Sequence, residues 1–269
     1  MLNTIFASRP EESSVRENRC DGPMSDCPAI YIRDLKLAYG GHVIFEGLDL
    51  DIEAGRFTTL LGTSGVGKSS LLKIVAGLQA PTGGTIAASD GKPISHRIAY
   101  MGQQDLLFPW LSVVENVMLG SRLRGDRRDP DRAMHMLEQV GLADRRDALP
   151  SQLSGGMRQR TAIARTLYES RPIVLMDEPF SALDTFTRSK VQELAAETLA
   201  ERTVLLITHD PLEACRLGHR LFVLSGSPAK LSPPISVPGC PPRSPEDLGL
   251  LETQAELMGT LLDAHTAAD

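Results

Sequence analysis

Apolar and polar residues alternate with a period of two through the first part of the chain. The alternation runs through residues 30–39 and again through residues 43–52, and Gly40 and Gly41 lie between the two runs. Period-two patterns that flank a glycine pair predict two strands joined by a turn. The apolar run at residues 57–61 ends at a glycine and is typical of a buried strand.

Patterns with helical spacing begin after Lys68. The residues that share one face of this predicted helix are Leu71, Leu72, Val75 and Leu78. Residues 104–165 are mainly helical in pattern. Within them, Asp129 and Pro130 predict the start of a helix, because an aspartate cap before a first-turn proline favours helix initiation.

Two further apolar runs of strand length occupy residues 172–176 and 203–208, and a predicted helix at residues 185–200 separates them. Strands that alternate with helices of this size predict a parallel sheet. The sequence therefore indicates an α/β fold whose central sheet is mostly parallel.

The two ends of the chain depart from this alternation. Residues 1–28 are rich in Glu, Arg, Ser, Asp and Pro, and we expect them to be disordered, with Met24 as an alternative translation start. Residues 29–245 are expected to form the main domain and residues 246–269 a helical tail. The apolar residues at helical spacing, which we expect to pack on the core, are Leu248, Leu251, Ala255, Met258 and Leu262.

Composition narrows the class of protein. The 269 residues include 42% hydrophobic and 23% charged residues, which is the ordinary globular range. The net charge of −6 disfavours nucleic acid as a partner, because binding to phosphate backbones depends on clustered Lys and Arg. No apolar run approaches the ~18 residues that a membrane helix requires, so any membrane function is expected to involve partner chains.

The four cysteines have no spacing typical of a metal site. The N-terminus lacks the charged and then apolar segments of a secretory signal, so we expect a cytosolic protein with reduced thiols. These cysteines are Cys20, Cys27, Cys215 and Cys240.

The first chemical motif is a glycine-rich loop between the buried strand at 57–61 and the helix that follows Lys68. Its sequence is Gly62-Thr63-Ser64-Gly65-Val66-Gly67-Lys68-Ser69. Glycines let consecutive backbone N–H groups surround phosphate oxygens, and the helix N-terminus adds its positive dipole end. We expect Lys68 to contact the outer phosphates and the Ser69 hydroxyl to bind Mg²⁺.

The second motif places two carboxylates after a buried strand. Asp177 and Glu178 follow the apolar residues 173–176, at the strand end where α/β sheets bind ligands. Asp177 is expected to hold Mg²⁺ and Glu178 to polarise an attacking water, with an exposed acidic turn as the alternative. His209 also follows a strand and precedes a helix capped by Asp210, which favours γ-phosphate sensing over a structural histidine.

A third motif, Leu153-Ser154-Gly155-Gly156, lies shortly before the acidic pair. It resembles the signature of ATP-binding cassette (ABC) proteins, and the motifs together resemble the ATPase subunit of an ABC transporter from Ile30 to Leu224. The resemblance implies a P-loop NTPase core, an antiparallel β subdomain and a helical subdomain inserted at about 104–165. Met157 stands where the usual signature has glutamine, but backbone N–H groups and Ser154 can still hold a phosphate.

The resemblance also implies ATP and Mg²⁺ as ligands and a role for each motif residue. Tyr39 would stack on adenine, Gln103 rather than the adjacent Gln104 would contact Mg²⁺ and the attacking water, and Asp184 would reach across a dimer interface. The implied nucleotide-binding residues are Tyr39, Gly62, Thr63, Ser64, Gly65, Val66, Gly67, Lys68, Ser69, Ser70, Ser154, Gly155, Gly156 and Asp184. The implied catalytic residues are Lys68, Gln103, Glu178 and His209, and the implied metal ligands are Ser69, Gln103 and Asp177.

The partners that the resemblance implies are a second copy in a head-to-tail dimer, transmembrane permease subunits and, indirectly, a solute-binding protein. Residues 103–117 are similar to the cassettes of importers for nitrate, sulfonates, taurine and aminopyrimidine thiamine precursors, and residues 223–243 favour the last class. A place on the cytoplasmic face of the inner membrane follows from this resemblance.

Four alternatives stay open. They are a soluble ABC ATPase of DNA repair or translation, an exporter cassette, a GTPase and an inactive cassette. The repair type would carry a long coiled coil, the translation type would carry two cassettes, and a GTPase would carry an Asn-Lys-x-Asp motif, none of which the sequence contains. Lys68, Asp177, Glu178 and His209 are all present, which disfavours an inactive cassette.

Overall fold

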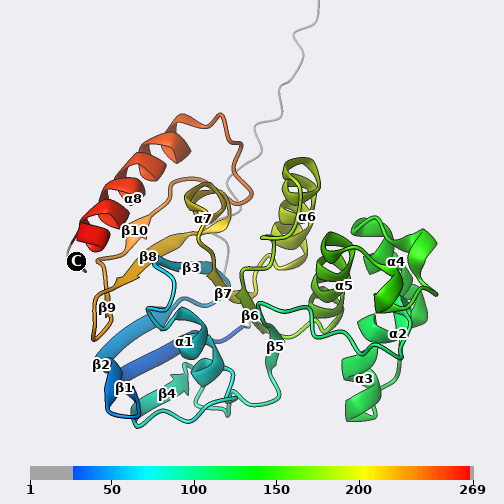
Figure 1. Ribbon diagram of the computed structural model, residues 1–269, viewed down its shortest axis with the longest axis horizontal. Coiled ribbons are helices and arrows are strands. Elements are labelled where there is room, and N and C mark those ends of the chain that lie inside the picture. Colours follow the sequence, from blue (N-terminus) through cyan, green and yellow to red (C-terminus); the bar gives the residue numbers. More distant parts are fainter. Residues whose placement is uncertain (1–26, 267–269) are drawn as a thin grey trace, which may run out of the picture.

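The structure is a computed structural model, and it describes residues 27–266 (Figure 1). A three-stranded sheet in the order β2-β1-β4 forms one layer, and both strand pairs are antiparallel. Its strands are β1 (Ile30–Tyr39), β2 (His42–Ile52) and β4 (Gly83–Ala88). Gly40 and Gly41 have φ angles of 54° and 87° and join β1 to β2, so the predicted pair of strands with a glycine turn is confirmed.

The central sheet has the strand order β10-β8-β3-β7-β6-β5, with β9 also paired to β8. Its strands are β3 (Phe57–Gly62), β5 (Ile98–Met101), β6 (Ile173–Asp177), β7 (Thr203–Ile207), β8 (Arg220–Ser225), β9 (Lys230–Leu231) and β10 (Ile235–Ser236). The neighbours from β8 to β5 are all parallel, whereas β9 and β10 run antiparallel to β8. The predicted mostly parallel sheet is therefore confirmed.

Helices cover the central sheet and extend from one side of it. Those near the sheet are α1 (Lys68–Val75), α6 (Thr185–Thr198), α7 (Pro211–Leu217) and α8 (Leu248–Thr266). Those that gather on the side away from the antiparallel sheet are α2 (Val113–Val117), α3 (Leu119–Arg124), α4 (Pro130–Gln139) and α5 (Gly155–Tyr168), together with 3₁₀ turns at Ala143–Arg145 and Pro150–Gln152 (Figure 1). As predicted, Asp129 caps α4 by accepting a hydrogen bond from Arg132 N at 3.0 Å, and Pro130 is the first helical residue.

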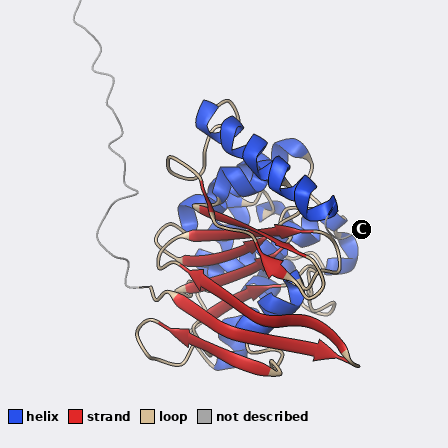
Figure 2. Ribbon diagram, turned by 90° about the vertical axis from the view of Figure 1, so that its left-hand side faces the viewer, coloured by secondary structure: helices blue, strands red, loops and turns tan. Residues whose placement is uncertain are grey.

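Three hydrophobic clusters hold these layers together. One joins the antiparallel sheet, α1 and one face of the central sheet, and it contains Phe45, Leu60 and Leu72. A second joins the opposite face to the helices α2, α4, α5 and α6. The third lies beneath α8, which packs on α7 and β8 on the far side of the central sheet from the antiparallel sheet (Figure 2).

The predicted buried face of α1 is confirmed at Leu71, Leu72 and Val75 but not at Leu78, and the predicted face of α8 is wrong. Helix α1 ends at Val75, because Gly77 has a φ angle of 72°, and Leu78 is exposed instead of lying on its buried face. Helix α8 forms, but it buries Leu250, Thr253 and Leu257. The residues that were expected to face the core are exposed, namely Leu248, Leu251, Ala255, Met258 and Leu262. Both sets have helical spacing, so periodicity alone could not choose between them.

The described chain begins inside the segment that the sequence predicts to be disordered. Cys27 and Pro28 are buried, and the Pro28 carbonyl accepts a hydrogen bond from Thr203 Oγ1 at 2.8 Å. Disorder is therefore the wrong prediction for these two positions, and the rest of the segment lies outside the described residues. Cys27 and Cys215 are buried and form no disulfide, whereas Cys240 is disulfide-bonded, which corrects the expectation that its thiol is reduced.

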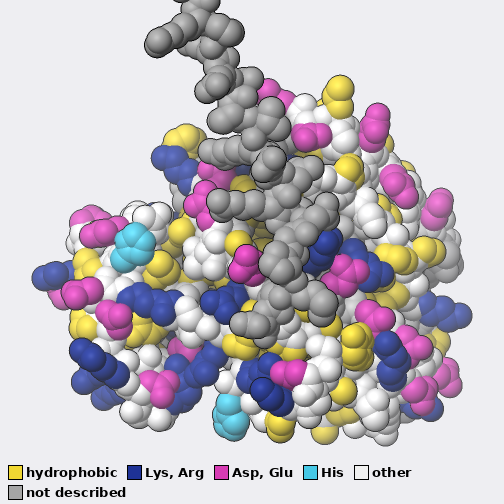
Figure 3. Space-filling view, turned by 180° about the vertical axis from the view of Figure 1, so that it is seen from behind, with side chains coloured by type: hydrophobic (Ala, Val, Ile, Leu, Met, Phe, Trp, Pro, Cys, Tyr) yellow, Lys and Arg dark blue, Asp and Glu magenta, His cyan; other side chains and the backbone are white. Residues whose placement is uncertain are grey.

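Two further features concern the charge of the surface and the apolar content of the helices. Lys and Arg side chains alternate with Asp and Glu side chains across the face shown in Figure 3. None of the helices within residues 27–266 combines the length and the apolar content that crossing a membrane requires.

Candidate functional site: a phosphate loop facing two strand ends

The glycine-rich loop connects the end of β3 to the start of α1, as predicted. Gly62, Gly65 and Gly67 have φ angles of 149°, 82° and 108°, which side chains rarely allow. A Cβ atom on Gly62 would lie 2.3 Å from the Leu224 carbonyl oxygen, and one on Gly67 would lie 2.9 Å from the Phe45 ring. The glycines are therefore required both for the turn of the loop and for its close packing against neighbouring strands.

Lys68 lies at the first position of α1 and is largely buried. Its Nζ atom donates hydrogen bonds of 2.8 Å to the carbonyl oxygens of Gly62 and Thr63. Burial lowers the pKa of this ammonium group, and the carboxylates of Glu178 and Asp177 oppose that effect. The loop thus holds a positive charge in its own concavity, together with the unsatisfied N–H groups at the start of a helix.

Asp177 ends β6 and is almost completely buried. Burial raises the pKa of its carboxyl, whereas a hydrogen bond with the Ser69 side chain lowers it. Glu178 raises the pKa further, and the positive charge of Lys68 lowers it. Ser69 and Asp177 are therefore in contact, as a shared metal site would require.

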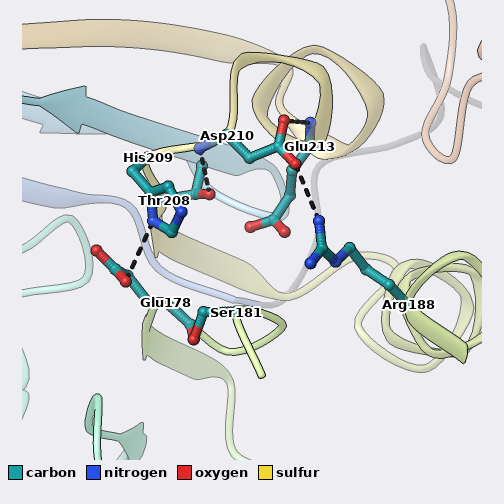
Figure 4. A pocket seen from close by; sticks show the side chains of 7 residues that line it. All are labelled: Glu178, Ser181, Arg188, Thr208, His209, Asp210 and Glu213. Carbon is teal, nitrogen blue, oxygen red and sulfur yellow. Dashed lines mark hydrogen bonds and ion pairs between the residues drawn. The ribbon is translucent and has the colours of Figure 1, made fainter. Parts of the chain in front are cut away.

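Glu178 leaves the strand in a left-handed conformation with a φ angle of 51°. Its backbone N–H donates to the Ile207 carbonyl at 2.9 Å, and its own carbonyl accepts from Gln159 Nε2 at 3.0 Å. Strand β6 stops at Asp177, so no continuing strand sets the direction of the Glu178 side chain. Instead, Glu178 Oε2 lies 3.2 Å from His209 Nδ1 (Figure 4).

These side chains share one cavity of about 320 Å³, within the range of small-ligand sites. The residues that line it are Gly62, Ser64, Gly65, Gly67, Lys68, Ser69, Ser70, Gln103, Glu178 and His209. Gln103 lines this cavity and Gln104 does not. The structure thus gathers the loop, the end of β6 and the segment after β7 in one place.

The signature residues lie elsewhere. Ser154 is the N-cap of α5, and its Oγ accepts a hydrogen bond from Met157 N at 3.3 Å. Met157, which replaces the usual glutamine, packs against the hydrophobic cluster of the helices. Gly155 lines a second cavity, of about 400 Å³, which also contains Gln103 but none of the residues 62–70.

Two other predicted nucleotide contacts also lie outside the first cavity. Tyr39 ends β1 with half of its surface exposed, so it is not simply a packed aromatic. Asp184 is the N-cap of α6 and accepts a hydrogen bond from Thr187 N at 3.0 Å, and hydrogen bonds lower its carboxyl pKa. Neither Tyr39 nor Asp184 lines the cavity around Lys68.

The segment between Gln103 and α2 presents an aromatic tip. Trp110 is 71% exposed and stacks near Phe108, with ring centroids 5.2 Å apart, whereas Leu111 is buried. Asn116, fully buried on α2, fixes this segment. Its amide nitrogen donates to the carbonyls of Phe108, Leu111 and Ser112, and its oxygen accepts from Phe108 N at 2.8 Å.

Sequence patterns did not identify several polar residues that hold the site. Gln159 on α5 binds the backbone of the Glu178 segment, and its oxygen accepts from Ala182 N at 2.7 Å. Arg188 on α6 and Glu213 on α7 line a small cavity together with His209 (Figure 4). In the sequence, such residues stand out only as polar positions on a helix face that is otherwise apolar. That pattern does not indicate which residue each of them binds.

The metal ligands can be tested against the described residues. Within residues 27–266 there is no cluster of three or more His, Cys, Asp and Glu side chains that could hold a metal. The groups beside the phosphate loop that could bind a metal are the buried carboxylate of Asp177, the hydroxyl of Ser69 and the amide of Gln103. This set suits Mg²⁺, which commonly takes one or two carboxylates and completes its shell with substrate phosphates and water.

Comparisons with known proteins agree with this geometry. The sequence profile of the family described as "ABC transporter" matches residues 45–181. An ABC transporter ATP-binding protein of Haemophilus influenzae is 42% identical over 237 residues, covering 86% of this chain and 98% of the relative. The aliphatic sulfonates import ATP-binding protein SsuB 1 of Rhodococcus jostii is 41% identical over 247 residues, covering 89% of this chain and 98% of the relative.

The fold is also similar to solved structures. The dimeric post-hydrolysis structure of the ATP-binding cassette MJ0796 bound to ADP and Pi matches with a TM-score of 0.71 and 29% identity. The matched region covers 78% of this chain and 99% of the MJ0796 chain. With its phosphate loop, its strand-end carboxylates and its signature helix, the chain belongs to the ABC transporter family and is an ATP-hydrolysing cassette.

Proposed function

We propose that this chain is the ATPase subunit that energises a membrane permease for the import of a small sulfonate. The observation that carries the proposal is the cavity in which Lys68, Glu178 and His209 meet. The choice of sulfonate is supported by relatives named as aliphatic sulfonate import proteins, at 41% and 40% identity over most of the chain. Nitrate, taurine and aminopyrimidine precursors are the competing solutes.

The residues that line the cavity would divide the work of hydrolysis. We propose that Lys68 and the backbone N–H groups of the loop hold the phosphates, with Tyr39 stacked on the adenine. Glu178 would accept a proton from the attacking water, a role worth about 10² to 10⁴ in rate. His209, whose Nδ1 lies 3.2 Å from Glu178 Oε2, would orient that carboxylate and contact the γ-phosphate.

Ser69, Asp177 and Gln103 are the proposed Mg²⁺ ligands. The contact between Ser69 and Asp177 and the position of Gln103 on the cavity wall support this assignment. A bound Mg²⁺ would neutralise charge that develops on the phosphate oxygens. Its positive charge would also keep Asp177 ionised despite the burial that raises the pKa of its carboxyl.

The second half of each site would come from another copy of the chain. Ser154, Gly155 and Gly156 do not line the cavity around Lys68, so we propose that they bind the γ-phosphate of a nucleotide held by the facing subunit. Asp184 would cross the same interface. The dimeric state of the MJ0796 cassette supports a pair of subunits, which we propose to face each other head to tail.

The remaining proposals concern organisation and partners. Residues 29–245 would form the ATPase domain, with a helical subdomain at about 104–165 and a tail at 246–269. The exposed Trp110, held on a segment that Asn116 fixes, would contact the permease. A permease at the cytoplasmic face of the inner membrane would connect this chain indirectly to a solute-binding protein.

The test is Glu178→Gln in the purified chain with Mg-ATP. We expect ATP turnover to fall by about 10² or more, while nucleotide binding persists and an ATP-bound dimer accumulates in gel filtration. Retained turnover would remove Glu178 as the main base. A reconstituted complex with the permease and binding protein should then transport sulfonate in preference to nitrate, taurine and aminopyrimidine, and a different preferred solute would refute the substrate assignment.

A further inference from the structure

A second, much smaller cavity lies beside the contact between Glu178 and His209, on the α6 and α7 side of it (Figure 4). Its volume is about 20 Å³, enough for one water molecule. The residues that line it are Glu178, Ser181, Arg188, Thr208, His209, Asp210 and Glu213.

Two polar atoms of this lining are buried without a hydrogen-bond partner in the described part of the chain. They are Nε of Arg188, a donor, and Oε1 of Glu213, which is an acceptor when the carboxyl is ionised. Buried polar atoms in folded proteins are nearly always paired, with protein or with ordered water. A donor and an acceptor left over on the wall of a cavity of one-water size are therefore complementary to a single bridging water.

The rest of the Arg188 guanidinium joins two loops of the proposed catalytic site. Its Nη2 donates to the Leu183 carbonyl at 2.9 Å, directly before Asp184, and its Nη1 lies 3.3 Å from Asp210 Oδ2. Asp210 in turn follows His209, and its backbone N–H donates to Thr208 Oγ1 at 3.0 Å. One side chain thus contacts the Asp184 loop and the His209 segment together.

The Glu213 carboxyl, on the wall of the small cavity, is held in place by hydrogen bonds between α6 and α7. Glu213 is 4% exposed, and its other carboxyl oxygen accepts from Gln192 Nε2 on α6 at 3.1 Å. Gln192 is itself held by Arg216 Nη1 at 2.7 Å. A water on Glu213 Oε1 would therefore be attached to the packed interface of α6 and α7.

We propose that the small cavity holds one water that accepts a hydrogen bond from Arg188 Nε and, when the Glu213 carboxyl is ionised, donates one to Glu213 Oε1. We also propose that Arg188 is a positioning residue coupling the Asp184 loop to His209. The inference rests on the proposed roles of Asp184, Glu178 and His209. When a facing subunit engages Asp184, the fixed guanidinium transmits the position of that loop to the segment that orients Glu178. Arg188 does not line the cavity around Lys68, so it is not proposed to contact the nucleotide or the attacking water.

The experiment compares steady-state ATP hydrolysis by the full chain and by Arg188→Gln and Arg188→Lys. Arg97→Gln is the matched control, because Arg97 makes a similar, partly exposed ion pair with Asp90 but lies outside both cavities. We expect kcat to fall by about tenfold or more in Arg188→Gln with KM for ATP within about threefold of wild type. Lysine keeps the charge but cannot reach all three partners, so Arg188→Lys should also lose kcat.

The outcomes separate the coupling from the catalytic assignment. If Glu178→Gln loses turnover and both Arg188 variants match Arg97→Gln in kcat, the coupling is refuted and the catalytic proposal stands. If Glu178→Gln keeps turnover, the catalytic proposal itself is wrong. Should Arg188→Gln fail to fold, as judged by its thermal midpoint, Arg188→Lys supplies the comparison.

The water has its own test. A high-resolution crystal structure of the full chain should show an ordered water within about 3.2 Å of both Arg188 Nε and Glu213 Oε1. A dry cavity, or a direct bond between the two atoms, would overturn the bridge.

Discussion

Glu213 should make this protein less stable as the pH rises from acid to neutral. Burial raises the pKa of its carboxyl from the ordinary value of 4.5 to about 7, and the Thr208 hydroxyl and the Gln192 amide offset only part of that effect. Asp210 raises the pKa, whereas Arg188 lowers it. The folded state therefore keeps a proton over a pH range in which the unfolded chain has lost it, so the free energy of unfolding decreases with pH across that range.

The structure sets the size of this effect. A difference between 4.5 and about 7 corresponds to about 3 kcal/mol of unfolding free energy, fully lost above pH 7, at about 1.4 kcal/mol for each pH unit. Replacing Glu213 with glutamine removes the titration and preserves the shape of the side chain. Its amide oxygen can still accept the hydrogen bond from Gln192 Nε2. The stability of Glu213→Gln relative to wild type should therefore rise by about 2.5 kcal/mol between pH 5 and pH 8.

The assay is urea unfolding of both proteins without nucleotide at several values between pH 5 and pH 8. Other buried groups titrate as well. Burial lowers the pKa of His219 to about 4, so its contribution to stability increases as the pH rises and opposes that of Glu213. Because both proteins contain His219, its effect cancels in their difference. A difference that stays constant within about 0.5 kcal/mol over this range would show that Glu213 is ionised in the folded protein.

Two further predictions concern the proposed contacts. Lys68→Ala should weaken Mg-ATP binding by about tenfold or more, because it removes the positive charge that Lys68 places inside the loop. Equilibrium dialysis measures the affinity of this variant and of the control Lys92→Ala, which removes an exposed lysine. Equal affinities of the two variants would contradict the phosphate-loop assignment. Trp110→Glu should leave ATP hydrolysis by the isolated chain unchanged but abolish transport by the reconstituted complex, and normal transport would move the permease contact away from the exposed indole.

The sequence predicted the elements of the fold better than their orientation. Strands ending at Gly62, Asp177 and Ile207 followed from short apolar runs, and the alternation with helices predicted their parallel arrangement. Helix α8 shows where such reasoning fails. Its buried face contains Leu250 and Leu257, while an equally periodic set of apolar residues faces solvent. Only the position of β8 and α7 beneath the helix decides which set is buried.

The candidate site shows the same division between what local sequence determines and what tertiary contacts determine. The phosphate loop was predictable because glycine spacing directly encodes backbone conformations, such as the φ angle of 108° at Gly67. The direction of the Glu178 side chain was not, because it depends on a left-handed backbone held by hydrogen bonds to Ile207 and Gln159. Residues that position other residues, such as Gln159, belong to no recognisable sequence motif.

These holding contacts connect several motifs of the proposed site within one subunit. On the signature helix α5, Gln159 binds the Glu178 segment, and Arg158 Nε lies 3.1 Å from Asp105 Oδ2, close to Gln103. On α6, Arg188 binds the Asp184 loop and Asp210. A nucleotide shifts a conformational equilibrium only through different affinities for the two states. Because each contact fixes two motifs at once, a γ-phosphate bound across a dimer interface would change the energy of several segments together, and its removal would release them together.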